Sequence, residues 1–137
     1  MVMPMRQETL DMGLSELLTA EDVESFLADK TGTKLLFYNS VCGCAAGGAR
    51  PGLRLALASD TTPDQMASLF TGMEISAVEA ARAAFPEIPG TSPAVGLIKD
   101  GEMVYWMPRH AIEGRMPQEI AAELVDAFNK FCAKTPA

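Results

Sequence analysis

The sequence has little positive charge and no long apolar run. Its 11 lysines and arginines are outnumbered by 18 aspartates and glutamates, which gives a formal net charge of −7. Charge-driven binding to nucleic acid or to an anionic membrane surface needs a basic footprint, so this balance disfavours both partners. No stretch approaches the roughly 18 consecutive apolar residues that a membrane-spanning helix needs.

The first nine residues also lack the pattern of a secretory signal. They contain Arg6 and Glu8 and no apolar run of seven residues or more. We therefore expect a soluble protein of the cytoplasm. A length of 137 residues fits one hydrophobic core, and we expect a single domain over residues 1–137.

Cysteine is scarce, and its three copies are unevenly placed. Cys42 and Cys44 are separated only by Gly43, whereas Cys132 lies near the end of the chain. The disulfide framework of a small secreted domain needs an even and distributed set, which this chain lacks. In a reducing compartment such a close pair favours redox chemistry or metal binding. We expect Cys132 to be a small buried hydrophobe, with an auxiliary redox role as the alternative.

Local patterns predict an alternation of helices and strands. Helices are expected at residues 8–17, 19–30, 42–58, 76–85 and 117–134. Strands are expected at residues 34–40, 65–70, 94–98 and 103–107. This order is a βαβ half followed by a ββα half, which is the thioredoxin arrangement. The predicted fold class is therefore α/β and thioredoxin-like, a mixed sheet of about four strands with helices on both faces.

Capping and turn residues mark several element boundaries. Thr19 and Ser76 are the predicted N-caps of two helices, the second within a capping box that ends at Glu79. Asp100-Gly101 predicts a type I′ hairpin turn between the last two strands. Pro51 removes a backbone donor and is expected to kink the helix over 42–58.

Cys42 follows directly on the first predicted strand and opens the next helix. The first turn of a helix has free N–H groups and partial positive charge, and both stabilise a thiolate. The pKa of the Cys42 thiol should therefore lie below the free value of about 8.5. The thiolate is the nucleophile of disulfide exchange. From the thioredoxin-type layout we assign Cys42 as the attacking thiol and Cys44 as the resolving thiol.

The spacing of the two cysteines predicts how readily their disulfide is reduced. Cysteines at i and i+2 can bond only across a tight, strained ring, which Gly43 makes easier to close. A strained disulfide tends to have a more oxidising potential. This suits isomerisation, or the removal of mixed disulfides, better than strong general reduction.

Two further segments are expected beside the cysteines. In thioredoxin-like proteins a cis proline before a strand faces the active cysteines and its preceding backbone pairs with substrate, which assigns this role to Ser92 and Pro93. An ordinary trans proline at a strand start is the alternative. The hairpin returns to the same end, so Arg109 or protonated His110 could favour the thiolate or hold an anionic group of a small thiol. The alternative is a solvated arginine and a histidine that packs or caps a loop.

At these motifs the chain resembles the bacilliredoxin family, thioredoxin-like proteins with a Cys-Gly-Cys site. The matching stretches are residues 19–23, 39–47, 49–51, 92–93 and 108–114. The resemblance implies reduction of mixed disulfides between proteins and bacillithiol, a low-molecular-weight thiol that would serve as co-substrate. It also implies protein disulfide isomerase activity as an alternative, with Cys42 attacking and Cys44 resolving in either case. No further cofactor and no metal are implied.

Two hypotheses of another class stay open. A metal-binding module could use Cys42, Cys44, Cys132 and His110, although zinc sites usually show CxxC-type pairs and this chain has one CxC. A partner-binding domain could keep the fold without turnover. The oligomeric state also stays open, with a homodimer among the options.

Overall fold

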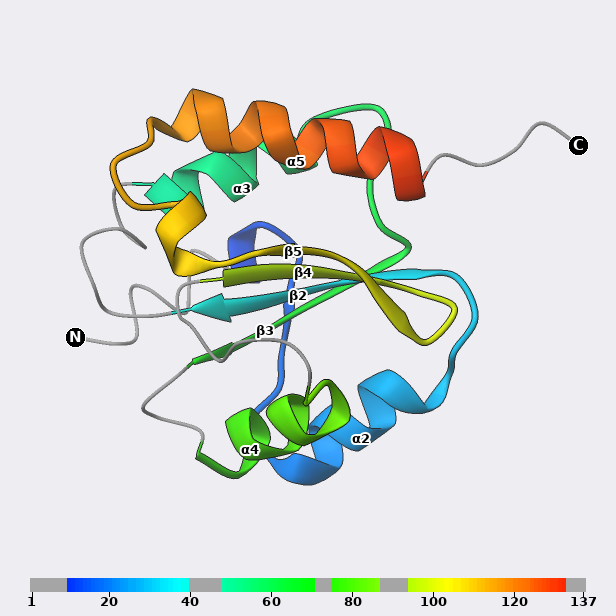
Figure 1. The fold of residues 1–137 in the computed structure, drawn as a ribbon. Coiled ribbons are helices and arrows are strands. Elements are labelled where there is room, and N and C mark those ends of the chain that lie inside the picture. Colours follow the sequence, from blue (N-terminus) through cyan, green and yellow to red (C-terminus); the bar gives the residue numbers. More distant parts are fainter. Residues whose placement is uncertain (1–9, 40–47, 71–74, 87–93, 133–137) are drawn as a thin grey trace, which may run out of the picture.

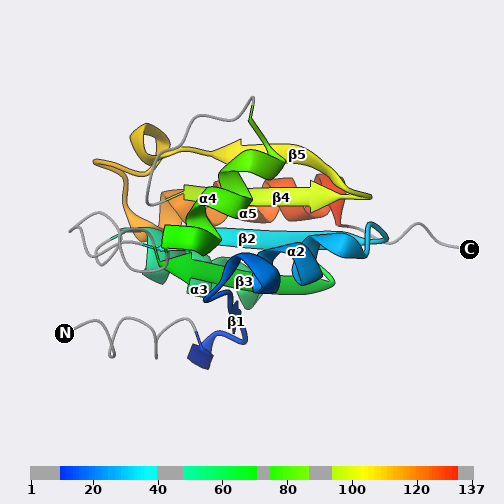
Figure 2. The same cartoon turned by 90° about the horizontal axis from the view of Figure 1, so that it is seen from below.

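The computed structural model describes residues 10–39, 48–70, 75–86 and 94–132. Within these ranges a five-stranded mixed sheet has helices on both faces (Figures 1 and 2). The strands are β1 (Ser15–Glu16), β2 (Thr33–Asn39), β3 (Gln65–Phe70), β4 (Ala94–Lys99) and β5 (Glu102–Met107). The helices are α2 (Ala20–Ala28), α3 (Arg50–Leu57), α4 (Ile75–Ala84) and α5 (Pro117–Phe131), with a short 3-10 helix η2 (Arg109–Ala111). The predicted mixed sheet with helices on both faces is confirmed, with one strand more than expected.

Strand β2 lies at the centre of the sheet, whose order is β1-β3-β2-β4-β5. It runs parallel to β3 and antiparallel to β4, so that Tyr38 stands opposite Leu69 on one side and Ala94 on the other. All seven of its residues are buried. A strand covered on both faces reads as a continuous apolar run, which is why its sequence predicted it well.

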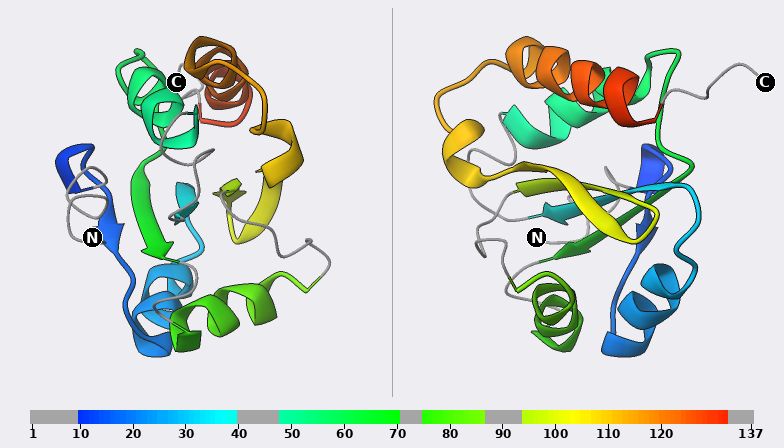
Figure 3. Two further views of the ribbon diagram at one scale, coloured as in Figure 1. Left: turned by 90° about the vertical axis from the view of Figure 1, so that its left-hand side faces the viewer. Right: turned by 45° about the vertical axis from the view of Figure 1, so that its right-hand side comes forward.

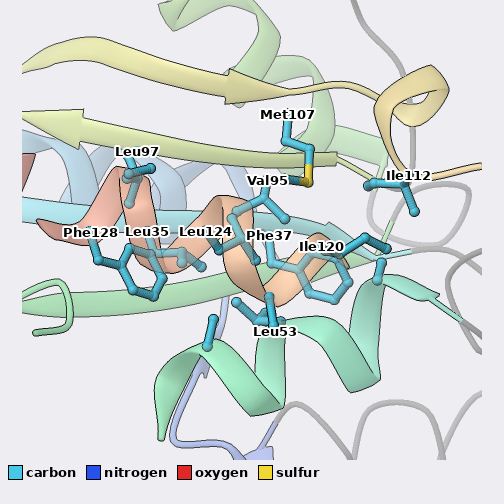
Figure 4. Close-up of a cluster of buried hydrophobic side chains, with 14 of the residues drawn as sticks. Leu35, Phe37, Leu53, Val95, Leu97, Met107, Ile112, Ile120, Leu124 and Phe128 are labelled. Atoms are coloured by element: carbon cyan, nitrogen blue, oxygen red, sulfur yellow. The ribbon is translucent and has the colours of Figure 1, made fainter. Parts of the chain in front are cut away.

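The two faces of β2 belong to two separate hydrophobic clusters. Leu35 and Phe37 pack in the cluster that includes α3 and α5, whereas Leu36 and Tyr38 pack in the cluster with α2 and α4. Figure 4 shows side chains of α3 and α5 converging on the β2 side chains of the first cluster. The alternation follows from the two-residue period of a strand.

Helix α3 is held against α5 at a position without a side chain. A Cβ atom added at Gly52 would lie 2.8 Å from Cγ2 of Ile120 and 3.2 Å from the carbonyl oxygen of Pro117. Only glycine permits this approach, so Gly52 sets the spacing of the two helices. Helix α3 thereby takes a fixed place over the sheet. In the sequence it follows soon after the cysteine-bearing segment.

The hairpin and most predicted boundaries are confirmed. Asp100 and Gly101 have φ angles of 51° and 88°, as a type I′ turn requires. Thr19 caps α2 through its hydroxyl, which accepts from the Asp22 amide at 3.1 Å. Helix α2 ends two residues before the predicted Lys30, where the ammonium group of buried Lys34 bonds to the Phe26 and Asp29 carbonyls.

The helix predicted over residues 8–17 is wrong for its second half. Ser15 and Glu16 form β1 and pair in parallel with Ala67 and Ser68 of β3. Gly13, at a φ of 92°, breaks the helical turn before them. The pairing covers an otherwise open edge of β3. These hydrogen bonds join residues far apart in the sequence, so a local helix pattern does not predict them.

One helix start also differs from prediction. Ser76 lies inside α4, which already includes Ile75, so it does not cap that helix. Pro51 lies in the first turn of α3, directly after π-helical backbone at residues 48 and 49, and the kink predicted at Pro51 stays a prediction. The predicted helical residues 42–47 and 133–134 lie outside the described ranges. No helix within those ranges is both long and apolar enough to cross a membrane.

Replacing Gly52 with alanine should destabilise the protein, although alanine is the better helix former. The added methyl group would press on Ile120, and overpacking of this kind costs about 1–3 kcal/mol. Helix propensity alone would instead favour alanine by roughly 1 kcal/mol. We expect a lower midpoint of urea unfolding for Gly52→Ala. A raised midpoint would contradict the close contact between α3 and α5.

Candidate active site

The predicted cysteine site is framed by described elements at one edge of the sheet. Cys42, Gly43 and Cys44 themselves lie outside the described residues, as do Ser92 and Pro93. Strand β2 ends at Asn39, three residues before Cys42, and helical backbone is present from residue 48 onward. The frame is therefore a strand on one side and a helix on the other, in agreement with the predicted setting.

The sheet register brings the other predicted segments to the same edge. Ala94, which directly follows Pro93, stands opposite Tyr38 near the end of β2. Met107, at the end of β5, stands opposite Val95. The η2 helix follows at this end, as Figures 1 and 3 show. The hairpin therefore returns Arg109 to the end of the sheet at which β2 ends, and its predicted closeness to Cys42 stays a prediction.

A buried hydrogen bond joins the two residues that flank the cysteine-bearing segment. Nη1 of Arg50 donates to Oδ1 of Asn39 at 3.0 Å, and the two residues are only 2% and 1% exposed. The bond joins the last residue of β2 to the first residue of α3, so it spans residues 40–49. Sequence reasoning missed this pair. The available signal was an arginine between Ala49 and Pro51, within a stretch that the family resemblance had already marked.

Arg109 occupies an exposed place on η2. Its side chain is 47% exposed and forms an ion pair with Glu113 one helical turn later. Exposed pairs of this kind contribute little stability, because water screens both charges. The pair with Glu113 therefore adds little to the stability of this segment. The side chain of His110 lies outside the described part of the chain, so its predicted role stays a prediction.

A polar network fixes the segment between η2 and α5. The Arg115 guanidinium donates to the carbonyl of Ala111 at 2.9 Å and to the Glu123 carboxylate at 2.8 Å. The Tyr105 hydroxyl of β5 bonds to the other oxygen of that carboxylate. Burial, together with Glu123, raises the pKa of Tyr105 above its usual range, so the phenol remains the donor. The network ties η2 to the sheet and to α5.

Cys132 lies at the opposite end of the sheet from this frame. It is 8% exposed, as predicted for a small buried hydrophobe, and its thiol interacts with the side chain of Thr33. Thr33 and Asn39 are the two ends of β2, which are about 20 Å apart at the usual rise of a strand. The metal set that would combine Cys132 with His110 therefore draws on opposite ends of the molecule. Among the described residues, no group of three acidic, histidine or cysteine side chains could hold a metal.

Comparisons with known proteins match nearly the whole chain. A family model described as Disulphide isomerase matches residues 1–132. A bacilliredoxin of Shouchella clausii is 48% identical over 97% of this chain and 92% of its own length. A bacilliredoxin of Salinibacter ruber is 44% identical over 96% of this chain and 78% of its own length.

Solved structures of low sequence identity share the fold. A reduced thioredoxin of Schistosoma mansoni superposes with a TM-score of 0.59 at 22% identity, covering 86% of this chain and 97% of that one. A mutant thioredoxin of Halobacterium salinarum gives a TM-score of 0.58 at 15% identity, covering 89% and 93%. At these identities the likeness shows the fold alone, and it confirms the thioredoxin-like prediction.

The Cys132 thiol should react slowly with iodoacetamide in the folded protein. Burial raises the pKa of this thiol, and the Asp64 carboxylate adds to that rise, so little thiolate forms near neutral pH. We expect alkylation at pH 7.5 to be at least roughly tenfold slower than in urea-unfolded protein. Time-resolved peptide mass spectrometry measures both rates. Equal rates would show that the Cys132 site is open to solvent.

Proposed function

Because this chain belongs to the bacilliredoxin family, whose family model is described as Disulphide isomerase, we propose that it removes bacillithiol from mixed disulfides with proteins. The bacilliredoxin relatives and the thioredoxin fold support the broader role of a thiol–disulfide oxidoreductase. The single observation that carries the proposal is the frame of β2 and α3 around the Cys-Gly-Cys segment, within a chain 48% identical to a bacilliredoxin.

In the proposed reaction the Cys42 thiolate attacks the sulfur of bacillithiol in the mixed disulfide. The S–S bond of the substrate breaks, and its two electrons leave on the sulfur of the freed protein, which takes up a proton. Cys42 then carries the bacillithiol as a new mixed disulfide. Cys44 loses its proton and attacks the Cys42 sulfur, which expels bacillithiol as a thiolate. The cycle ends with a Cys42–Cys44 disulfide, and an external dithiol or two thiols reduce it again.

The substrate-binding groups of the proposal surround this chemistry. The backbone before Pro93, including Ser92, would pair with the protein substrate, and Gly43 would allow its close approach. Arg109 and His110 would hold an anionic group of the small thiol. The support for this placement is that the end of β2, the start of β4 and the end of β5 meet at one edge of the sheet.

A second function, isomerisation of protein disulfides, is favoured by the description of the matching family model. It would use the same attack by Cys42 on a disulfide between two protein cysteines. The two functions differ in the leaving group, which is either a small thiol or a second protein thiol. A scrambled disulfide protein and a bacillithiol-modified protein, offered separately, distinguish them.

Cysteine variants test the proposed reaction directly. Cys42→Ser should lower the release of bacillithiol from a modified protein by more than roughly 100-fold, because the nucleophile is lost. Cys44→Ser should still attack, and should accumulate an adduct heavier than the reduced protein by one bacillithiol less two hydrogens. Intact-protein mass spectrometry measures the adduct, and a thiol assay measures the release.

Cys132→Ser serves as the control, since Cys132 lies at the far end of β2 and should leave both readouts unchanged. Adduct formation on Cys44 in the Cys42→Ser variant would reverse the two roles. Release by the Cys42→Ser variant at the parent rate would contradict the proposed chemistry.

Arg109→Ala tests recognition of the small thiol. We expect KM for the bacillithiol-modified substrate to rise several-fold with little change in kcat, because an exposed cation that contacts only the bound group affects binding. Stability should change by less than about 0.5 kcal/mol, since the Arg109–Glu113 pair is exposed. Steady-state kinetics and urea unfolding measure the two effects.

The matched variant Glu113→Gln removes the carboxylate that competes for Arg109, so KM should stay constant or fall. An unchanged KM in Arg109→Ala would assign Arg109 to the solvated surface.

A further inference from the structure

A cavity of about 180 Å³ lies among the end of α2, the end of α4 and the β4–β5 hairpin. Figure 1 shows α2 and α4 side by side on one face of the sheet. The start of β2 reaches the cavity through Lys34, so the cavity lies at the opposite end of that strand from Asn39. Its described lining contains none of the groups that the proposed exchange reaction uses.

Part of the lining is apolar. Leu27, Phe85 and Ile98 contribute to it, and they belong to the hydrophobic cluster that joins α2 and α4 to the sheet. A cavity of about 150 Å³ is large enough for a benzene ring, so this one can take an organic group of that size. Contact with these three side chains favours a ligand with an apolar body over an inorganic ion.

Lys34 brings a buried cation to this cavity. The residue is 3% exposed, and its ammonium group donates to the backbone carbonyls of Phe26 and Asp29. An ammonium group has three N–H donors, so one is left without an oxygen acceptor in the described part of the chain. The Phe26 ring, whose centroid is 5.2 Å from Nζ, attracts the charge but supplies no oxygen. An anionic oxygen in the cavity would complete the hydrogen bonding of this group.

Lys30 places a second cation at the same cavity. The residue is exposed and contributes to the lining. A Cβ atom added at Gly101 would lie 3.0 Å from Cδ and 3.1 Å from Cγ of Lys30, so the stem of this lysine packs on the hairpin turn. A long side chain that is already held along its stem loses less conformational freedom when its charged end binds a ligand.

The charges of the lining indicate the charge of the ligand. The one carboxylate in it, that of Asp29, accepts from the amide of Thr31 at 3.0 Å and from its hydroxyl at 2.7 Å. These bonds, and then the charge of Lys34, hold the pKa of Asp29 below its usual value, so it stays ionised at neutral pH. The Asp100 carboxylate, which accepts from the amide of Gly32, is outside the described lining. The two lysines and Asp29 together leave one positive charge, which a monoanion balances and a dianion exceeds.

We propose that this cavity binds a small organic carboxylate, a monoanion whose apolar body is about the size of a benzene ring. Its carboxylate would bond to the ammonium groups of Lys34 and Lys30, and its body would contact the apolar part of the lining. This inference does not depend on the proposed function, because it concerns the end of β2 remote from Asn39.

Benzoate is the probe, and benzyl alcohol is its neutral counterpart of similar size. We expect benzoate to shift the amide resonances of residues 27–34, 84–85 and 98–101 in heteronuclear NMR spectra, with a Kd of about 1 mM. Benzyl alcohol should bind at least roughly tenfold more weakly, because it offers the two lysines no charge.

Lysine variants locate the binding. Lys34→Met should raise the Kd for benzoate at least roughly tenfold, because a buried charged hydrogen bond is lost. Lys30→Met should raise it about threefold, since this cation is exposed. Lys99→Met is the matched control: Lys99 is an exposed lysine beside the same hairpin turn and outside the described lining, so its loss should leave the Kd unchanged.

Each result decides the inference. It is overturned if about 20 mM benzoate shifts no resonance of these residues, if benzyl alcohol binds equally well, or if Lys99→Met weakens binding as much as Lys34→Met. Tighter binding of phenyl phosphate, a dianion at pH 7.5, overturns the assignment of a monoanion.

Should Lys34→Met fail to fold, Ala84→Phe decides. Ala84 is an exposed residue of the lining, so this change narrows the cavity without removing a charge or a core contact. Loss of benzoate binding in the folded Ala84→Phe variant supports the site. An unchanged Kd in that variant contradicts it, because benzoate then binds the lysines without entering the cavity.

Discussion

The burial of β2 on both faces is the constraint on which the rest of the structure depends. All seven residues of the strand are buried, and it pairs with β3 on one side and β4 on the other. Its side chains alternate between two hydrophobic clusters, so a shift of register by one residue would exchange every apolar contact. The register is therefore fixed, and with it the position at which the strand ends.

That fixed end determines where the cysteine-bearing segment begins. Asn39 closes the strand just before the Cys-Gly-Cys segment, and Arg50 opens α3 just after it, with a buried bond between them. Helix α3 is in turn held at a set distance by the contact of Gly52 with Ile120. The segment between these two anchors carries the cysteines to which the proposed exchange reaction is assigned.

Two buried cations, Lys34 and Arg50, bond to neutral oxygen atoms at opposite ends of β2. The Lys34 ammonium bonds to carbonyl groups at the end of α2 and thereby completes a helix terminus. The Arg50 guanidinium bonds to an amide oxygen at the base of the cysteine-bearing segment. Cys132 lies at the Lys34 end of the sheet, near Thr33, and so at the opposite end of β2 from Asn39, which leads into the Cys-Gly-Cys segment.

The sequence by itself determined the elements whose signals are local. The apolar run of β2, the Asp100-Gly101 turn and the Thr19 cap each depend on a few consecutive residues, and the structure bears them out. The Cys-Gly-Cys motif and the family resemblance could likewise be recognised in the sequence. The tertiary structure alone decided that Ser15 and Glu16 form a strand and that Arg50 is buried whereas Arg54 is exposed. These outcomes depend on partners more than ten residues away, β3 for the strand and Asn39 for the arginine, and no local pattern encodes a distant partner.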